Sequence, residues 1–382
     1  MKTYPTSVIN QQLQEKLTII IPTHERHFHL RRILDHFVKL SCPIIVADSS
    51  SSNLSDSFVF SSNVTYLHLP SLGLFQKLLY CIHLVETPYL MFHADDDFVL
   101  LSSLPLCVSF LEINQDYSCV QGHCLGFLEK SENVYQWSPI LYETLIYKNL
   151  SDDPTVRLKY TFLFHCPLAY AVTRSDVMRI IADSISRCVH NSINAFAEEW
   201  LLQFGYSLYG KNKFLPILYM LRQQKESSYK EPKQQTIDEI RKKAPFPIWY
   251  QTAIQIDSAT ELFTDYTSWV NAMVLMLKRS SVTEIDHQKI IQECAKNLIN
   301  FYRMHYMRCS EQDWMDYLSI WGNCHTQLSH LEGVCQNESG LLNILNSHVD
   351  RRFQRIDSGV LPTEFAKIIE TLKKHRNCSL HL

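Results

Sequence analysis

Glycine is scarce in this sequence, with 9 among 382 residues, and neither G-x-G-x-x-G nor G-x-x-x-x-G-K-[ST] occurs. The first pattern forms the turn that holds a dinucleotide, and the second forms the loop that wraps a phosphate chain. A dinucleotide fingerprint and a phosphate-binding loop are therefore excluded. Any phosphate that this protein binds must be neutralised in another way.

Cysteine pairs, excess basic charge and long apolar runs are missing as well. None of the 12 cysteines forms a C-x-x-C pair, and most lie in apolar surroundings, which is typical of reduced core thiols. The formal net charge is -3, which argues against nucleic acid as the main partner. No segment reaches the roughly 18 apolar residues of a transmembrane helix, and the N-terminal apolar run is too short for a secretory signal. We therefore expect a cytoplasmic protein without a transmembrane segment.

Apolar strands and helical stretches alternate from residue 17 onwards. Strands are expected at 17–21, 44–48, 65–69 and 89–92, and helices at 27–40 and 73–86. Such alternation predicts βαβ units on a parallel sheet. A strand at 119–129, a strand leading into a helix over 164–185 and a helix over 195–210 continue the α/β pattern.

The composition divides the chain into three parts. Residues 1–16 are an N-terminal extension, residues 17–235 an α/β domain that ends in a polar linker at 223–235, and residues 236–382 a helical C-terminal domain. The last part is helically periodic and poor in strand signals.

Three polar segments directly follow expected strands: PTHER at 22–26, DSSSS at 48–52 and DDD at 95–97. Ligands of parallel sheets bind at the carboxyl ends of the strands, so we expect these segments to meet in one crevice. Adjacent carboxylates repel one another and favour a neutralising cation. Strand alternation would place Asp95 and Asp97 on one side as a metal-binding pair, while a solvated acidic turn is the alternative reading.

Four elements in this order carry a family resemblance: LTIIIPTHERHFHLRRIL, IIVADSSSS, KLLYCIHLVETPYLMFHADDDF and FAEEWLL. Over about residues 17–224 the chain resembles the GT-A glycosyltransferases, particularly the inverting family 2 and its small bacterial relatives. The resemblance implies an α/β, Rossmann-like GT-A fold with a mostly parallel sheet, to which the helical C-terminal domain is appended. It also implies transfer of a sugar from a nucleotide-diphosphate sugar, preferably a UDP-sugar, to a hydroxyl of a glycan, lipid or protein acceptor.

The resemblance implies nucleotide-sugar contacts at Thr23, His24, Glu25, Asp48, Ser49, Lys77, Asp95, Asp96 and Arg222. Thr23, His24 and Glu25 would line the nucleotide pocket, and Asp48 would bond the base edge with Ser49 beside it. Lys77 would approach the nucleotide or its phosphates. Asp96 would contact ribose or sugar hydroxyls. Thr23 and Asp48 could instead cap local structure, and Lys77 could be a solvated lysine.

The implied cofactor is Mn²⁺ or Mg²⁺, held by Asp95 and Asp97 and neutralising the diphosphate. Relatives often begin the acidic run one residue earlier, where this chain has Ala94, and often supply a late histidine to the metal. At that place this chain offers Arg222, Gln223 or Gln224, which would contact the diphosphate instead.

The implied catalytic residues are Glu198 and Glu199, one of which would remove the proton of the acceptor hydroxyl. The alternative is that both only favour a helix N-terminus through its dipole. Arg157 and Arg174 are candidates for the acceptor side.

Two other functions compete with glycosyl transfer. A sugar-nucleotide nucleotidyltransferase shares the sheet arrangement, but it normally opens with a glycine-rich basic loop that IIPTHERHFHLRR lacks. A degenerate nucleotide-sugar-binding scaffold is suggested by Ala94 and the missing late histidine.

Overall fold

The structure is a computed structural model that describes residues 13–131, 134–140, 150–159, 168–188, 195–223 and 259–283, with short helical pieces within 286–294 and 367–375. Its strands are β1 (Leu17–Thr23), β2 (Ile44–Asp48), β3 (Val64–His68), β4 (Tyr89–Phe92), β5 (Phe98–Val99), β6 (Tyr117–Ser131), β7 (Val134–Ile140), β8 (Val172–Arg174) and β9 (Lys211–Gln223). Its helices are α2 (His27–Phe37), α3 (Leu74–Ile82), α4 (Leu104–Ile113), α5 (Pro154–Lys159), α6 (Ser175–Cys188), α7 (Ala195–Tyr209) and α10 (Ala259–Lys278).

The expected alternation of strands and helices is confirmed, and β2 and β4 have the expected bounds. Helices α2 and α3 end at Phe37 and Ile82, earlier than the expected residues 40 and 86. Strand β9 was not foreseen. Its last residue is Gln223, where the sequence suggested a linker.

All strands form one sheet in the order β3-β2-β1-β4-β8-β6-β9-β5, with β7 paired to β6. The pairs β1–β2, β1–β4 and β2–β3 are parallel, and β6–β9 is parallel as well. Strand β8 is antiparallel to both β4 and β6, and β5 is antiparallel to β9. The first half of the sheet therefore has the parallel βαβ arrangement, which puts the ends of β1, β2 and β4 on one edge.

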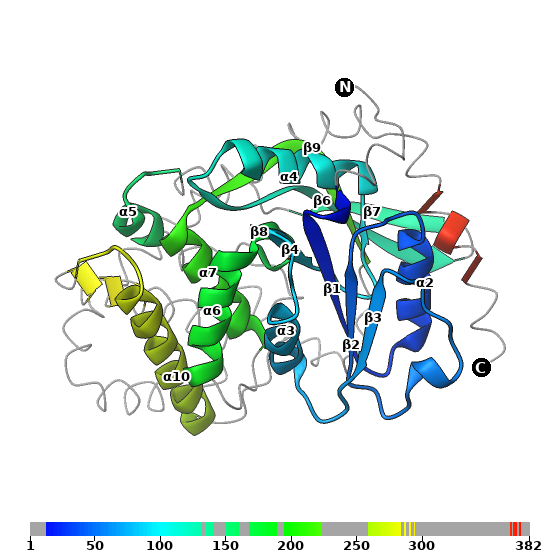
Figure 1. Cartoon of the computed structure of the whole chain (residues 1–382), viewed down its shortest axis with the longest axis horizontal. Coiled ribbons are helices and arrows are strands. Elements are labelled where there is room, and N and C mark those ends of the chain that lie inside the picture. The colour runs from blue at the N-terminus through cyan, green and yellow to red at the C-terminus, as the bar shows by residue number, and fades with distance from the viewer. Residues whose placement is uncertain are drawn as a thin grey trace, which may run out of the picture.

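Helices cover both faces of the parallel half. The chain runs from β1 outwards to β2, and then from β3 back across to β4, so two right-handed crossovers place α2 and α3 on opposite faces. Figure 1 shows β1, β2 and β3 between these two helices. The strands β1, β2 and β4 are buried along nearly their whole length, which is typical of a sheet covered on both faces.

Helix α10, the well-described part of the expected C-terminal domain, packs against α6 and α7 (Figure 1). Trp269, Met273 and Met276 are buried in the same hydrophobic core as the sheet. Tyr209 of α7 donates a hydrogen bond to the Met276 carbonyl at 2.7 Å, and Arg279 pairs with Asp183 at 2.6 Å. The division at residue 235 stays a prediction, but α10 shares its core with the α/β part.

The cysteines in the described residues are free thiols, and all but Cys188 are buried. Burial raises the pKa of Cys42 and Cys81 to about 12. Among the described helices, none combines the length and the apolar character that crossing a membrane requires.

Gly122 offers a test of how closely β6 and β9 approach each other. A Cβ atom there would lie 2.5 Å from the Ile217 carbonyl oxygen, which belongs to the backbone and cannot rotate away. We expect Gly122→Ala to lower the free energy of unfolding by about 1–3 kcal/mol in urea titrations. Gly73→Ala is the control, because its new Cβ would meet only Gln76 at 3.6 Å. Equal stability of the two variants would contradict this packing.

Candidate functional site

The ends of β1 and β2 lie side by side, since Thr23 is the register partner of Asp48. Lys77 of α3 contacts the ends of both strands. Its ammonium donates to the Thr23 carbonyl at 2.6 Å and to Ser49 Oγ at 2.9 Å. Lys77 is buried, and this burial lowers its pKa. Lys77 is therefore a buried positive charge next to the expected nucleotide site, and not a solvated lysine.

The two loops that follow β1 and β2 are joined by side chains of the predicted set. His24 Nδ1 lies 3.0 Å from the Ser49 carbonyl oxygen, and the Ser51 amide donates to Glu25 Oε1 at 2.6 Å. Glu25 has a positive φ of 51°, which is uncommon for a residue other than glycine. The predicted cluster at 23–25 and 48–49 is thus brought together by the structure.

Asp48 is completely buried and accepts hydrogen bonds at both carboxylate oxygens. Oδ1 accepts from the amide and the hydroxyl of Ser50, while Oδ2 lies 2.7 Å from His27 Nε2 and accepts from the Tyr66 hydroxyl at 2.7 Å. Burial favours a higher pKa for Asp48, but these hydrogen bonds outweigh it and lower the pKa. Asp48 does close its own turn through Ser50, as the alternative reading expected, and it is also the centre of a wider network.

The three aspartates 95–97 follow β4 as a tight turn rather than as a strand. Arg26 Nη1 lies 3.1 Å from Asp95 Oδ1, and Arg26 Nη2 pairs with Asp96 Oδ2. The expectation from strand alternation was therefore wrong, because the turn directs both Asp95 and Asp96 towards Arg26. Thr23 donates to Asp95 Oδ2 at 2.7 Å, so its hydroxyl binds the acidic turn and does not cap α2, whose N-cap residue is Arg26.

Asp97 faces the end of β9, because β5 and β9 pair and place Phe98 opposite Leu221. Arg222 Nε donates to Asp97 Oδ2 at 3.2 Å, and the Gln223 amide donates to Oδ1 at 2.9 Å. Burial raises the pKa of Asp97 to about 6, with Arg222 opposing and Asp96 adding to the rise. Arg222 thus lies at the acidic turn, although 125 residues separate it from Asp97, and its predicted contact with the diphosphate stays a prediction.

Arg32, which the sequence analysis did not single out, supports the same turn from α2. Its Nη2 donates to the Asp96 carbonyl at 3.0 Å and to Gln223 Oε1 at 2.6 Å. Burial lowers the pKa of Arg32 to about 10, and the charges of the three aspartates oppose this. The only available sequence signal was its place two turns after the PTHER segment.

Glu199 lies near the N-terminal end of α7 and is partly exposed, whereas the side chain of Glu198 lies outside the described residues. Tyr170 interacts electrostatically with Glu199 and with the acidic turn. Burial raises its pKa, Arg222 opposes the rise, and the charges of Asp97 and Glu199 add to it. The Arg222 guanidinium also lies 4.9 Å from the centre of the Tyr170 ring. Glu199 and Asp97 therefore both lie close enough to Tyr170 to affect its pKa.

Arg157 and Arg174 do not contribute to the site. Arg157 donates to the Ser207 and Leu208 carbonyls at the C-terminal end of α7, opposite the end that carries Glu199. Arg174 donates to the Tyr117, Leu111 and Asn114 carbonyls around the end of α4. Both arginines bind backbone carbonyls that a helix or turn leaves unpaired, which is a structural role.

The residues that the structure describes include no group of three or more His, Cys, Asp or Glu side chains arranged to hold a metal ion. Two oxygens of Asp95 and two of Asp97, the predicted ligands, accept contacts from Arg26, Thr23, Arg222 and the Gln223 amide. Gln224 lies outside the described residues.

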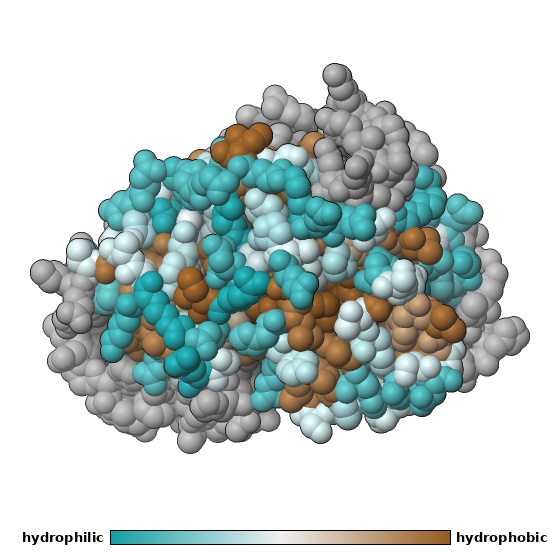
Figure 2. Space-filling view, viewed as in Figure 1, coloured by the Kyte–Doolittle hydropathy of each residue, from teal (hydrophilic) through white to brown (hydrophobic). Residues whose placement is uncertain are grey.

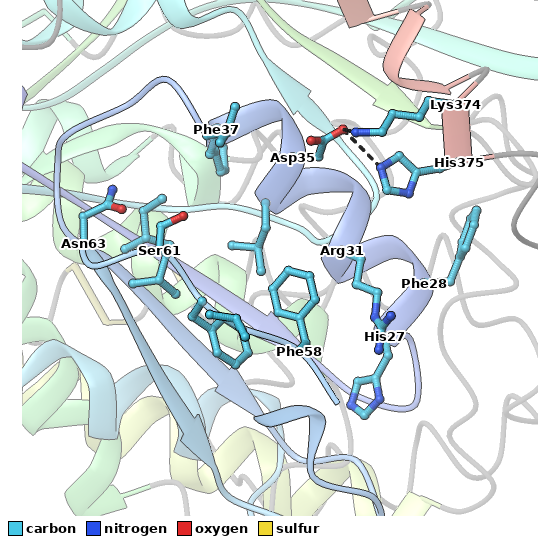
Figure 3. A pocket seen from close by; sticks show the side chains of 16 residues that line it. His27, Phe28, Arg31, Asp35, Phe37, Phe58, Ser61, Asn63, Lys374 and His375 are labelled. Atoms are coloured by element: carbon cyan, nitrogen blue, oxygen red, sulfur yellow. Dashed lines mark hydrogen bonds and ion pairs between the residues drawn. The ribbon is translucent and has the colours of Figure 1, made fainter. Parts of the chain in front are cut away.

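A separate hollow of about 690 Å³ runs along α2. It is lined mainly by α2 and by residues 58–64, and its rim carries Lys374 and His375, which both contact Asp35 (Figure 3). Figure 2 shows hydrophobic surface gathered over β3 and α2 on this side. His27 lines the hollow, and its ring also reaches Asp48 of the site described above.

A half-parallel sheet with polar residues at the ends of β1 and β2 and an acidic turn after β4 defines the GT-A class of α/β proteins. Residues 18–173 match the model of glycosyl transferase family 2, which spans β1 to the first residues of β8. This part of the chain is therefore similar in sequence to glycosyl transferase family 2.

A solved structure supports the GT-A fold, and others are similar to a lesser degree. S. aureus TarS 1–349 in complex with UDP-GlcNAc matches with a TM-score of 0.50 and 12% identity over 79% of this chain and 79% of that chain. S. aureus TarS matches with a TM-score of 0.47 and 11% identity over 79% of this chain and 48% of that chain. A mycobacterial protein matches with a TM-score of 0.36 and 10% identity over 74% and 81% of the two chains. No curated protein matches the sequence significantly.

Tyr66 tests the network around Asp48. Its hydroxyl donates to Asp48 and accepts from the Leu54 amide at 2.9 Å. We expect Tyr66→Phe to lower the free energy of unfolding by about 1–3 kcal/mol, because a buried carboxylate and an amide each lose a partner. Urea titrations at several pH values measure this.

The pH dependence of this loss has a definite sign. Because the folded-state pKa of Asp48 is lowered, its stabilising contribution is present above its unfolded pKa of about 3.9 and disappears as the pH falls through the folded value. The difference between wild type and Tyr66→Phe should therefore shrink in acid. Tyr80→Phe, at an exposed tyrosine, is the control. A loss that is the same at every pH would show that Tyr66 does not act through Asp48.

Proposed function

We propose that the protein transfers a sugar from a nucleotide-diphosphate sugar to an acceptor hydroxyl, with inversion at the anomeric carbon and with a glutamate as general base. The observation that supports this most strongly is the convergence of three segments at one edge of the sheet. Thr23 with Asp48, Asp95 with Thr23, and Asp97 with Arg222 are in register or in hydrogen-bonded contact. These are the segments in which a family 2-like enzyme holds its donor.

The donor is proposed to lie across the ends of β1, β2 and β4. The base and ribose contact the loops that carry His24, Glu25 and Ser49, next to the buried carboxylate of Asp48. The diphosphate lies by the acidic turn, where Arg222 and the buried ammonium of Lys77 supply positive charge. A UDP-sugar is the proposed donor, supported by the TarS 1–349 structure, which holds UDP-GlcNAc in a chain of the same fold.

Mn²⁺ or Mg²⁺ is proposed as the cofactor, with Asp95 and Asp97 as its ligands. The predicted ligands suit a hard divalent ion, because such an ion prefers carboxylate oxygens and three carboxylates are adjacent here. Asp97 is buried beside Asp96, and a cation there would favour the charged form of both carboxylates. The ion would neutralise the charge that develops on the departing diphosphate.

Side chains of the protein are proposed to carry out the transfer itself. The acceptor oxygen forms a bond to the anomeric carbon while the bond from that carbon to the diphosphate oxygen breaks. The proton of the acceptor hydroxyl passes to the carboxylate of Glu198 or Glu199 at the start of α7. Arg222, held over Tyr170 and against Asp97, is placed to contact the diphosphate.

The acceptor is a glycan, lipid or protein hydroxyl, and the helical C-terminal domain is proposed to help select it. The cytoplasmic location expected from the sequence stays a prediction. A nucleotidyltransferase loses support, since the family match is to glycosyltransferases.

The first test concerns metal-dependent donor binding. Calorimetric titration of UDP into the wild-type protein should show much tighter binding with Mn²⁺ than without it, and Asp97→Asn should lose this difference. Asp56→Asn, at an exposed aspartate on the loop after β2, is the matched control. An Asp97→Asn variant with the Mn²⁺ dependence of the wild type would remove Asp97 from the metal site. UDP binding that is independent of metal would instead support a scaffold.

The second test concerns the general base. Glu198→Gln and Glu199→Gln keep size and polarity but cannot accept the proton. We expect one of them to lower kcat by about 10²-fold or more with nearly unchanged UDP affinity, because proton transfer is lost and donor contacts are not. Two fully active variants would show that the base lies elsewhere.

A further inference from the structure

Arg26 holds two of the three aspartates at once. One terminal nitrogen of its guanidinium lies 3.1 Å from Asp95 Oδ1, and the other pairs with Asp96 Oδ2. The Arg26 side chain is 30% exposed, while those of Asp95 and Asp96 are 4% and 12% exposed. Arg26 therefore covers the carboxylates from the solvent side, which is the side from which a diffusing cation arrives.

The other two arginines at the turn have further anchors. Arg32 is buried, and it donates to a backbone carbonyl and to Gln223. Arg222 lies against the Tyr170 ring as well as Asp97. The Arg26 guanidinium, by contrast, forms ion pairs with Asp95 and Asp96. Of these three arginines, Arg26 is thus the one whose position depends on the two carboxylates.

The start of α2 gives the Arg26 charge no stabilisation of its own. Arg26 is the N-cap residue of α2, with non-helical φ and ψ of -135° and 37°, and it makes no side-chain cap. No acidic residue lies in the first turn of α2, so the positive end of the helix dipole opposes the Arg26 charge. Glu25, with its positive φ, precedes it. The aspartates therefore stabilise an arginine that its own helix does not.

We propose that Arg26 is an exchangeable counter-ion of the acidic turn, which occupies Asp95 and Asp96 in the free protein and delays cation binding until the donor arrives. This rests on the proposed donor site. When the diphosphate binds, Arg26 exchanges its carboxylate partners for phosphate oxygens, and Asp95, one of the two proposed metal ligands, becomes available to the cation. Metal and donor then bind cooperatively, because each favours the arrangement that the other needs.

The experiment measures Mn²⁺ binding without any nucleotide, by calorimetry or by loss of the free-ion EPR signal. We expect Arg26→Gln to bind Mn²⁺ at least about tenfold more tightly than the wild type, because a positive charge a few ångströms from the ion is removed. Arg26→Lys keeps the charge but cannot bridge two carboxylates, so its affinity should be intermediate. Arg31→Gln removes a charge from the same helix, where the side chain contacts Ser57 and Phe58, and should leave Mn²⁺ binding unchanged.

A second arm repeats the titrations with UDP at saturation. In the wild type UDP should tighten Mn²⁺ binding strongly. In Arg26→Gln the ratio of the Mn²⁺ affinities with and without UDP should be at least about tenfold smaller, because the competing positive charge is already absent. Folded variants, checked by thermal unfolding, that bind Mn²⁺ without nucleotide as weakly as the wild type would overturn the proposal. If the wild type does not bind UDP at all, the proposed function fails, while the titration without nucleotide still decides the role of Arg26.

Discussion

The burial of three adjacent carboxylates is the constraint on which the site depends. Asp95, Asp96 and Asp97 are each at most 9% exposed, and uncompensated charges at this depth would destabilise the fold severely. The chain answers with Arg26, Arg32 and Arg222, which come from the loop before α2, from α2 itself and from the end of β9. The acidic turn therefore links elements that are distant in the sequence, among them β9, which pairs with β5.

This constraint connects the second half of the sheet to the first. Strand β9 reaches the turn only because it runs parallel to β6 and antiparallel to β5. Its last two residues then satisfy both oxygens of Asp97. On the other side Thr23 ties the turn to β1, and Lys77 ties β1 to the loop after β2. Hydrogen bonds therefore connect the proposed donor site with both halves of the sheet.

Much of this site could be predicted from the sequence, because the rule that parallel strands bring their carboxyl ends together needs only strand positions. Thr23, Asp48 and the aspartates were found in this way. The resemblance to GT-A enzymes added Lys77 and Arg222, whose partners no local pattern reveals.

Other features could not be predicted, for reasons that are equally physical. Alternation misassigned Asp95 and Asp96 because three adjacent aspartates form a turn more readily than a strand. Arg26 and Arg32 were passed over, since a basic residue near a helix start gives no sign of which distant carboxylate it will meet. Arg157 and Arg174 were misassigned because an arginine that binds backbone carbonyls has no signature in the sequence.

The central claim is that the nucleotide diphosphate binds at the ends of β1, β2 and β4, against the acidic turn. A crystal structure of the protein grown with UDP and Mn²⁺ tests this most directly. The account predicts density for the base beside Asp48 and for the diphosphate beside Asp95 and Asp97, with Arg26 moved off its aspartates. A nucleotide bound instead in the hollow between α2 and residues 58–64, with the acidic turn unchanged, would contradict it.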